Sequence, residues 1–245
     1  MTSTRHPIDV RPDDPLLRWM GSRRPPPDLI AEGSNVAWLG RASRVEESWV
    51  SGLGDDPVIV ARLVEELAGR HPVDGVTVVE GAFELLPPAL RSPDPGFWCH
   101  WTLDPATAGN VPTTAEELDL DDPRIGPLLE HSDSAHIFPG NERLATWAGV
   151  VQDDRLLAVA GLVMEPSGAA HIVSVCTDPE FRGRGLARDA CGWLIQSAVA
   201  AGAPMIVLEM YTANEAGRRT YSALGFTETG RYASGLLAHA LPSDR

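Results

Sequence analysis

The sequence contains no lysine, since all 20 of its basic side chains are arginines. This absence excludes Schiff-base catalysis by a lysine amine and a nucleotide-binding loop of the G-x-x-x-x-G-K-S/T type. The chain also lacks a run of about 18 apolar residues, which a membrane-spanning helix needs. Its formal net charge of −14 leaves no basic footprint for nucleic acid. We therefore expect neither a nucleic-acid partner nor a membrane partner.

Cysteine is scarce as well. Three residues, Cys99, Cys176 and Cys191, make a poor disulfide framework and fit a reducing compartment. The first 14 residues contain no apolar segment of the kind found in secretion signals. We therefore expect a cytoplasmic protein. The acidic charge would attract a cationic substrate such as an amine, although an acidic surface also serves solubility alone.

The chain divides into two parts of different character. Residues 104–123 are rich in Pro, Thr, Gly and Asp, as a linker is. They place a domain boundary near residue 112 and predict an N-terminal domain over 1–112 and a second domain over 113–245. The first 50 residues show little periodicity. A helix beginning at Pro57, with Asp56 as its cap, is the clearest N-terminal element, and strands over 76–80 and 97–103 flank a broken helical turn.

The second part has stronger signals. Short helices are predicted over 125–130 and 142–147, followed by two apolar strands that a hairpin joins at residues 153–155. A third strand, a helix over 186–201, a strand, a helix from Asn214 to Leu224 and a last strand complete the order. Such a mixture predicts an α/β (α+β) fold in which helices pack on a sheet.

The most informative segment is the glycine-rich loop before the helix at residue 186. It reads Arg182-Gly183-Arg184-Gly185-Leu186-Ala187 and follows an apolar strand. A helix N-terminus leaves backbone N–H groups unpaired and carries partial positive charge. Glycines let that backbone approach a ligand, and a diphosphate is the natural guest. The spacing is not the G-x-G-x-x-G of dinucleotide-binding folds.

Residues 171–195 resemble the acetyl-CoA motif of the GNAT acyltransferases, in which Q/R-x-x-G-x-G/A follows a bulged strand. Arg182, Gly185 and Ala187 occupy the three defining positions. A second signature lies downstream, in the order Asn214, Tyr221, Leu224-Gly225-Phe226. The resemblance covers residues 113–235, and within the superfamily it is nearest to the FR47-like branch. It implies a mixed, mostly antiparallel twisted sheet with a splayed central strand pair.

The resemblance also implies a site. Acetyl-CoA would be the co-substrate, without a metal, and Tyr221 would be the acid that protonates the departing thiolate. The residues implied to bind the cofactor are Val175, Cys176, Thr177, Arg182, Gly183, Arg184, Gly185, Leu186, Ala187 and Asn214. Two alternatives stay open, since Tyr221 could be a core residue and Asn214 a plain helix cap. Cys176 and Cys191 read as small buried residues.

The acceptor is expected to be a small primary amine, and a homodimer is a further hypothesis. Glu209 and His171 are both candidates for the general base. The main alternative function is a non-catalytic acyl-CoA-binding sensor or interaction module, and O-acylation or a longer acyl donor is a third. The N-terminal half carries no catalytic motif; its element order suggests a degenerate GNAT repeat.

Overall fold

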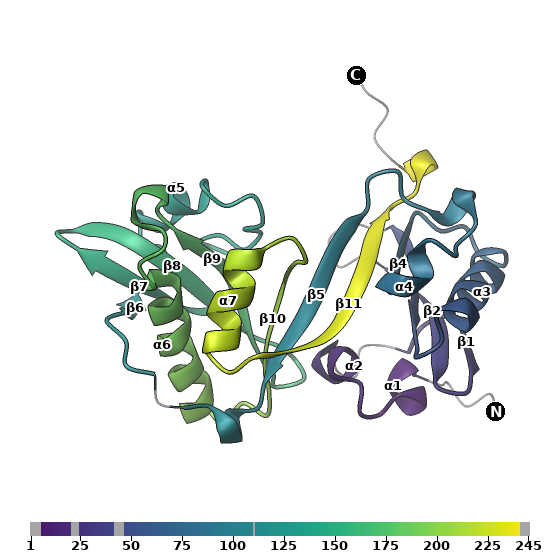
Figure 1. Ribbon diagram of the computed structural model, residues 1–245, viewed down its shortest axis with the longest axis horizontal. Coiled ribbons are helices and arrows are strands. Elements are labelled where there is room, and N and C mark those ends of the chain that lie inside the picture. The colour runs from purple at the N-terminus through teal and green to yellow at the C-terminus, as the bar shows by residue number, and fades with distance from the viewer. Residues whose placement is uncertain (1–5, 21–24, 42–46, 110, 241–245) are drawn as a thin grey trace. The chain divides into compact units, whose positions relative to one another are not determined.

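The computed structural model describes residues 6–20, 25–41, 47–109 and 111–240. They form two compact units (Figure 1). Unit 1 draws on Met1–Cys99, Tyr211–Ala213 and Gly230–Arg245, and unit 2 on His100–Met210 and Asn214–Thr229. The units are therefore interleaved along the chain. The boundary near residue 112, expected for separate domains, stays a prediction.

Unit 1 contains a sheet with the strand order β1-β2-β3-β4-β11. Its neighbouring strands pair antiparallel, except that β3 and β4 are parallel. The strands are β1 (Leu29–Glu32), β2 (Asn35–Arg41), β3 (Ser48–Leu53), β4 (Gly75–Val79) and β11 (Thr227–Leu236). The helices are α1 (Pro7–Val10), α2 (Pro15–Met20), α3 (Pro57–Ala68) and α4 (Glu80–Phe83), with short 3-10 turns at Pro88–Leu90 and Ala238–Ala240.

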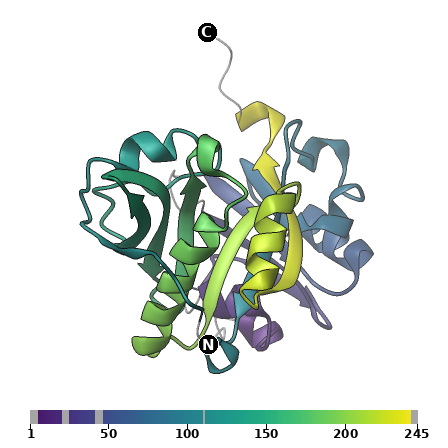
Figure 2. The ribbon, with the colours of Figure 1, turned by 60° about the vertical axis from the view of Figure 1, so that its left-hand side comes forward.

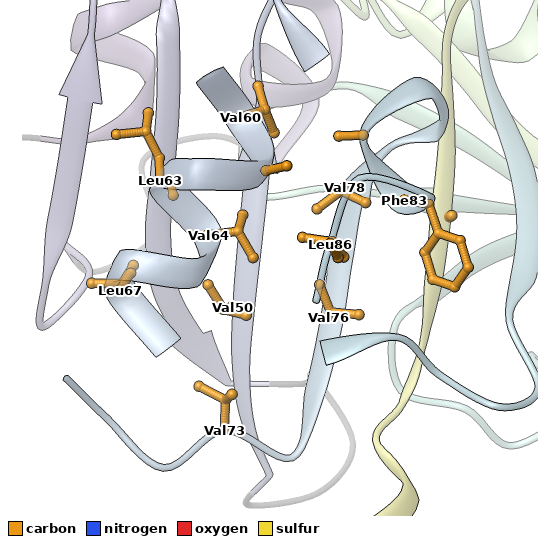
Figure 3. Close-up of a cluster of buried hydrophobic side chains, with 14 of the residues drawn as sticks. Val50, Val60, Leu63, Val64, Leu67, Val73, Val76, Val78, Phe83 and Leu86 are labelled. Atoms are coloured by element: carbon orange, nitrogen blue, oxygen red, sulfur yellow. The ribbon is translucent and has the colours of Figure 1, made fainter. Parts of the chain in front are cut away.

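Helix α3 makes the parallel crossover from β3 to β4 and packs its apolar face on the sheet (Figure 3). As predicted, it begins at Pro57, and the Asp56 carboxylate accepts from the amides of Val58 and Ile59. The approach to β3 is close, since a Cβ on Gly52 would lie 2.5 Å from Val64 Cγ2. The buried cluster includes Val50, Val60, Leu63, Val64, Leu67, Val76, Val78, Phe83 and Leu86. Each such side chain contributes about 1.5–3 kcal/mol of burial free energy.

Unit 2 repeats this arrangement with the strand order β10-β9-β8-β7-β6, again antiparallel except for the parallel pair β9–β10. The strands are β6 (Glu116–Leu118), β7 (Leu144–Gln152), β8 (Arg155–Met164), β9 (Ala170–Thr177) and β10 (Ile206–Tyr211). The helices are α5 (Ile125–Leu129), α6 (Leu186–Ala200) and α7 (Glu215–Ala223), with 3-10 turns at Pro105–Thr107 and Pro179–Phe181. Strand β5 (Gly96–Leu103), like β10 and β11, has residues in both units.

Helix α6 lies against β7, β8 and β9, next to α7 (Figure 2). Helix α5 packs instead into a separate cluster around Trp147, Val159 and Val173, which contains no α6 residue. The two helices thus cover opposite faces of the unit 2 strands. The predicted fold class, a mixed and mostly antiparallel sheet with flanking helices, is confirmed.

Two local predictions were wrong or incomplete. The helix expected over 142–147 does not form, because β7 begins at Leu144, and Trp147 pairs with Leu118 of β6 and Gly161 of β8. These long-range pairings override the local pattern. The first 50 residues, which show little periodicity, contain β1, β2 and the first half of β3, and the predicted linker contains β6. The hairpin at 153–155 is confirmed, with Asp153 and Asp154 at positive φ.

Candidate active site

Strand β9 carries a β-bulge. Its register with β8 shifts between Val159 and Gly161, and Ser174 adopts a φ of 50°. A positive φ is uncommon for a residue with a side chain, and a bulge of this kind bends its strand. The Ser174 hydroxyl donates to the carbonyl of Ile137 at 2.8 Å and accepts from its amide at 3.1 Å. The bulge is thereby fixed to the loop that follows α5.

The parallel ladder between β9 and β10 is short. It has two Cα pairs at the start of the strands, and His171–Val207 is the last. Within the described residues, the rest of β9 has no partner on β10, so the two strands part as the resemblance implies. An open strand edge can bind an extended ligand through main-chain hydrogen bonds. The three residues predicted to hold pantetheine, Val175, Cys176 and Thr177, lie on this edge.

The three cysteines are buried free thiols. Burial raises the pKa of Cys176 and raises that of Cys191 to about 12. The Cys176 thiol donates to the carbonyl of Leu128 at 3.2 Å. A nucleophilic cysteine needs a lowered pKa, so the interpretation of Cys176 and Cys191 as small buried residues is confirmed.

Residues 178–185 form the loop between β9 and α6. Gly183 and Gly185 have φ values of 77° and 81°, and a Cβ built on either would meet no atom within 4 Å. Gly185 is the N-cap of α6, and this position makes no side-chain cap hydrogen bond among the described residues. The first residues of this 15-residue helix, Leu186 and Ala187, therefore begin at an N-terminus that the protein leaves open. The predicted anion site has the backbone geometry that it requires.

The arginines of this loop differ in their contacts. Arg182 donates to the carbonyls of Thr177 (3.3 Å) and His131 (3.2 Å), so its guanidinium ties the loop to β9 and to the residues after α5. The guanidinium of Arg184 lies over the ring of Phe181, 4.7 Å from its centroid. Arg188 is exposed in the first turn of α6. Within the described residues, Arg184 and Arg188 have no carboxylate partner.

A second set of residues stabilises the loop. Its central residue, Arg155, lies outside the sequence motif. Arg155, the first residue of β8, donates to the Asp178 carboxylate at 2.6 and 3.1 Å and to Glu180 at 2.7 Å. Burial opposes ionisation of Asp178, but the amide of Glu180 and the guanidinium of Arg155 outweigh it, and its pKa is lowered. The only sequence signal for Arg155 is its place as the last residue of the predicted hairpin connection, 153–155.

Helix α7 carries the other two predicted residues. Asn214 is exposed and caps the helix, its side-chain oxygen accepting from the amide of Gly217 at 2.8 Å. Tyr221 is only 7% exposed, and its ring packs edge-on against Phe226 at 6.1 Å. Burial, and secondarily Cys191, raises the pKa of Tyr221. Both residues therefore have the structural roles weighed above, and their cofactor and acid roles stay predictions.

The two candidates for the base lie on neighbouring strands. His171 of β9 is buried, with its Nδ1 3.1 Å from Glu165 Oε1, and Arg143 donates to the same carboxylate oxygen at 2.8 Å. Glu209 lies on β10 and is partly buried. A further histidine, His100, is buried near His171, and burial lowers its pKa to about 3. The geometry orients His171 but does not choose between it and Glu209.

Features of two other kinds are absent from the described residues. No group of three or more His, Cys, Asp or Glu side chains that could hold a metal ion occurs among them. None of the helices in the same residues is long and apolar enough to cross a membrane.

Comparisons with known proteins agree on one family. The model of the acetyltransferase (GNAT) family matches residues 113–226. These residues contain β6 to α7, with the bulge, the loop and both predicted signatures. No curated protein matches the chain.

Solved structures are similar over nearly the whole chain. A GNAT-family acetyltransferase structure from Novosphingobium aromaticivorans is 25% identical, with a TM-score of 0.55, and the match covers 95% of this chain and 98% of that one. Structures of GCN5-related N-acetyltransferases from Kribbella flavida (14% identical, TM-score 0.54, 94% and 96% covered) and Sphaerobacter thermophilus (13%, 0.51, 90% and 84%) share the fold. The match therefore includes the N-terminal half.

Proposed function

Because this chain belongs to the GNAT superfamily and is an acyltransferase, we propose that it transfers an acetyl group from acetyl-CoA to a primary amine. The observation that carries the proposal is the open N-terminus of α6. Two glycines at positive φ, with free space above them, expose backbone N–H groups beside Arg184. This arrangement suits a diphosphate, which is the charged centre of coenzyme A.

The edge of β9 supports the same ligand. Past His171 the strand has no β10 partner among the described residues, so pantetheine can pair with residues 175–177 as an added strand. The thioester would then lie where β9 and β10 part. Placing both substrates there supplies orientation, and a backbone N–H can polarise the thioester carbonyl.

The reaction is a direct displacement. The neutral amine attacks the carbonyl carbon, the C–N bond forms, and the C–S bond breaks. Coenzyme A leaves as the thiol after taking a proton from Tyr221, and the surplus proton of the attacking amine passes to His171, to Glu209 or to water. A phenol has an ordinary pKa of about 10, and burial raises the pKa of Tyr221 further, so the group holds its proton at neutral pH until thiolate charge develops.

The acceptor is proposed to be a small amine. The formal net charge of −14 attracts a cation over long range. The three buried free thiols suit a reducing compartment, so we propose a cytoplasmic location. Assembly as a homodimer stays a hypothesis.

The test is a thiol-release assay with acetyl-CoA and a panel of small amines. All three cysteines of the protein are buried, so a thiol reagent will report mainly released coenzyme A. We expect release that depends on at least one amine. If acetyl-CoA binds but every amine leaves thiol release at the blank rate, the acyl-CoA-binding module becomes the better account.

A further inference from the structure

Phe181 contacts two guanidinium groups at the edge of the proposed diphosphate site. The Cζ atoms of Arg155 and Arg184 lie 4.8 and 4.7 Å from its ring centroid. Both distances are within the range of a cation–π interaction, which is about 6 Å. Phe181 is the last residue of the 3-10 turn at Pro179–Phe181, inside the β9–α6 loop. The ring thus connects an arginine of β8 to an arginine of the loop.

The charges of these two arginines are balanced differently. Arg155 is neutralised by Asp178 and Glu180, which it contacts at 2.6 and 2.7 Å. Arg184 has no carboxylate partner within the described residues. It is therefore the cation that keeps its full charge for a ligand, and the Phe181 ring restricts where its guanidinium lies.

Arg155 itself is well anchored. Its partner Asp178 is buried, accepts from the amide of Glu180 at 3.0 Å, and donates its own amide to the carbonyl of Leu157 at 2.9 Å. A planar guanidinium that reaches two carboxylates and an aromatic ring fixes their relative positions in a way that an ammonium does not. The Arg155 side chain therefore contacts three residues of the loop, at positions 178, 180 and 181.

We propose that Arg155 is a positioning residue for acyl-CoA, which fixes Phe181 so that Arg184 is presented to the diphosphate. The inference rests on the proposed function and adds to it a division of labour among the arginines. Arg184 binds the anion, Arg182 ties the loop to neighbouring carbonyls, and Arg155 acts through Phe181 without touching the ligand.

The experiment measures the Kd of coenzyme A by calorimetry for the wild type, Arg155→Met, Arg184→Met and the double variant. Arg124→Met is the matched control, because Arg124 also donates through Nε and Nη2 to one carboxylate, Asp122, at 3.0 and 2.7 Å. Arg124→Met also removes one positive charge. Within the described residues, Arg124 has no hydrogen bond or ion pair with the loop at 178–185, and its further hydrogen bond goes to the carbonyl of Asp154 at 3.3 Å. We expect Arg155→Met to raise the Kd about 10-fold and Arg124→Met to change it less than about 2-fold.

The double variant separates positioning from a general loss of structure. If Arg155 acts through Arg184, Arg155→Met will have little further effect once Arg184 is methionine, so the two effects will not add. Arg155→Lys, which keeps the charge, should retain only part of the affinity. Thermal melts verify that each variant folds.

The outcomes distinguish the two claims. Wild-type protein that does not bind coenzyme A contradicts the proposed function and removes this inference with it. If the wild type binds coenzyme A but Arg155→Met and Arg124→Met have equal effects on the Kd, only the positioning role is overturned. The same conclusion follows if the effects of Arg155→Met and Arg184→Met are additive.

Discussion

The crossover from β3 to α3 in unit 1 and that from β9 to α6 in unit 2 have the same topology, yet their helices begin differently. In unit 1 the loop is residues 54–56, and the Asp56 carboxylate occupies the amides of the first turn of α3. The adjacent Asp55 accepts from Arg11 and Ser34. In unit 2 the loop is residues 178–185, and no side chain caps α6. The Asp56 carboxylate therefore occupies the N-terminus of α3, whereas the N-terminus of α6 has no capping side chain among the residues that the structure describes.

The strands before these loops, β3 and β9, also differ in how completely they pair with their neighbours. β3 pairs with β2 without a register shift and shares four Cα pairs with β4. β9 carries the Ser174 bulge and shares two Cα pairs with β10. Unit 1 therefore has a closed strand edge and unit 2 an open one. A shared topology does not determine function; the bulge and the loop do.

The same comparison bears on the hypothesis of a degenerate repeat. Each unit has antiparallel strands, a helix and a parallel strand in the same order. This agreement of topology supports the hypothesis, and superposition of the two units will test it. If the units differ in function as they differ in structure, substitutions in the two units will have different effects.

The largest effect is expected from Gly185→Glu. It puts a carboxylate where the diphosphate is proposed to lie, and it should weaken coenzyme A binding at least about 1,000-fold, or about 4 kcal/mol. Gly185→Gln separates charge from bulk. Gly33→Glu, in the β1–β2 turn of unit 1, is the matched control, since Gly33 also has a positive φ and open space. Equal Kd values for Gly185→Glu and the wild type, measured by calorimetry, would refute the loop assignment.

The second effect concerns acid stability. Burial lowers the pKa of His100 in unit 2 from 6.5 to about 3. Between these two values the imidazole is protonated in the unfolded chain and neutral in the folded chain. The contribution of His100 to the free energy of unfolding is therefore fully present above pH 6.5 and is lost as the pH falls toward 3. Between pH 6.5 and 4.5 the loss should be about 2–3 kcal/mol.

Urea titrations at several pH values measure this loss. His100→Gln should flatten the pH dependence, because it removes the buried imidazole that stays neutral in the folded chain. Parallel pH profiles for His100→Gln and the wild type would show that His100 does not control acid stability.

The third effect is catalytic. Tyr221→Phe should lower kcat about 100-fold, at the low end of general acid catalysis, while the Kd of coenzyme A stays within about 2-fold of the wild type. Tyr232→Phe is the control, because Tyr232 is a buried tyrosine of unit 1 that packs on Trp98. Unchanged turnover in Tyr221→Phe would return this residue to a purely structural role.

The smallest effect tests the filled helix N-terminus of unit 1. Asp56→Ala should lower the free energy of unfolding by about 1 kcal/mol, because two amides lose their cap, and Asp56→Asn should lower it less. Coenzyme A affinity should stay the same in both. A gain of a second coenzyme A site in Asp56→Ala would show that the two crossovers differ only by their caps.

Much of the candidate site could be predicted from the sequence because it is local. Gly183, Gly185 and the N-terminus of α6 are neighbours in the chain, so their spacing alone indicates the anion site. The cap of α7 at Asn214 is local in the same way. The fold class followed from the order of elements, although one helix was assigned in place of the start of β7.

The parts that sequence reasoning missed depend on contacts between distant residues. Arg155 meets Asp178 across 23 positions, and Ser174 meets Ile137 across 37. Strand β11 pairs with β4 across more than 150 positions, from Tyr232–Val79 onward, which is why the interleaving of the two units is invisible in a single sequence. Such pairs carry no periodicity or spacing that one sequence reveals.

The most direct test is a crystal structure grown with saturating coenzyme A. We predict diphosphate oxygens within about 3 Å of the backbone nitrogens of residues 183–187, and no ligand at the N-terminus of α3. Coenzyme A bound elsewhere, with the turn before Leu186 vacant, would contradict the account.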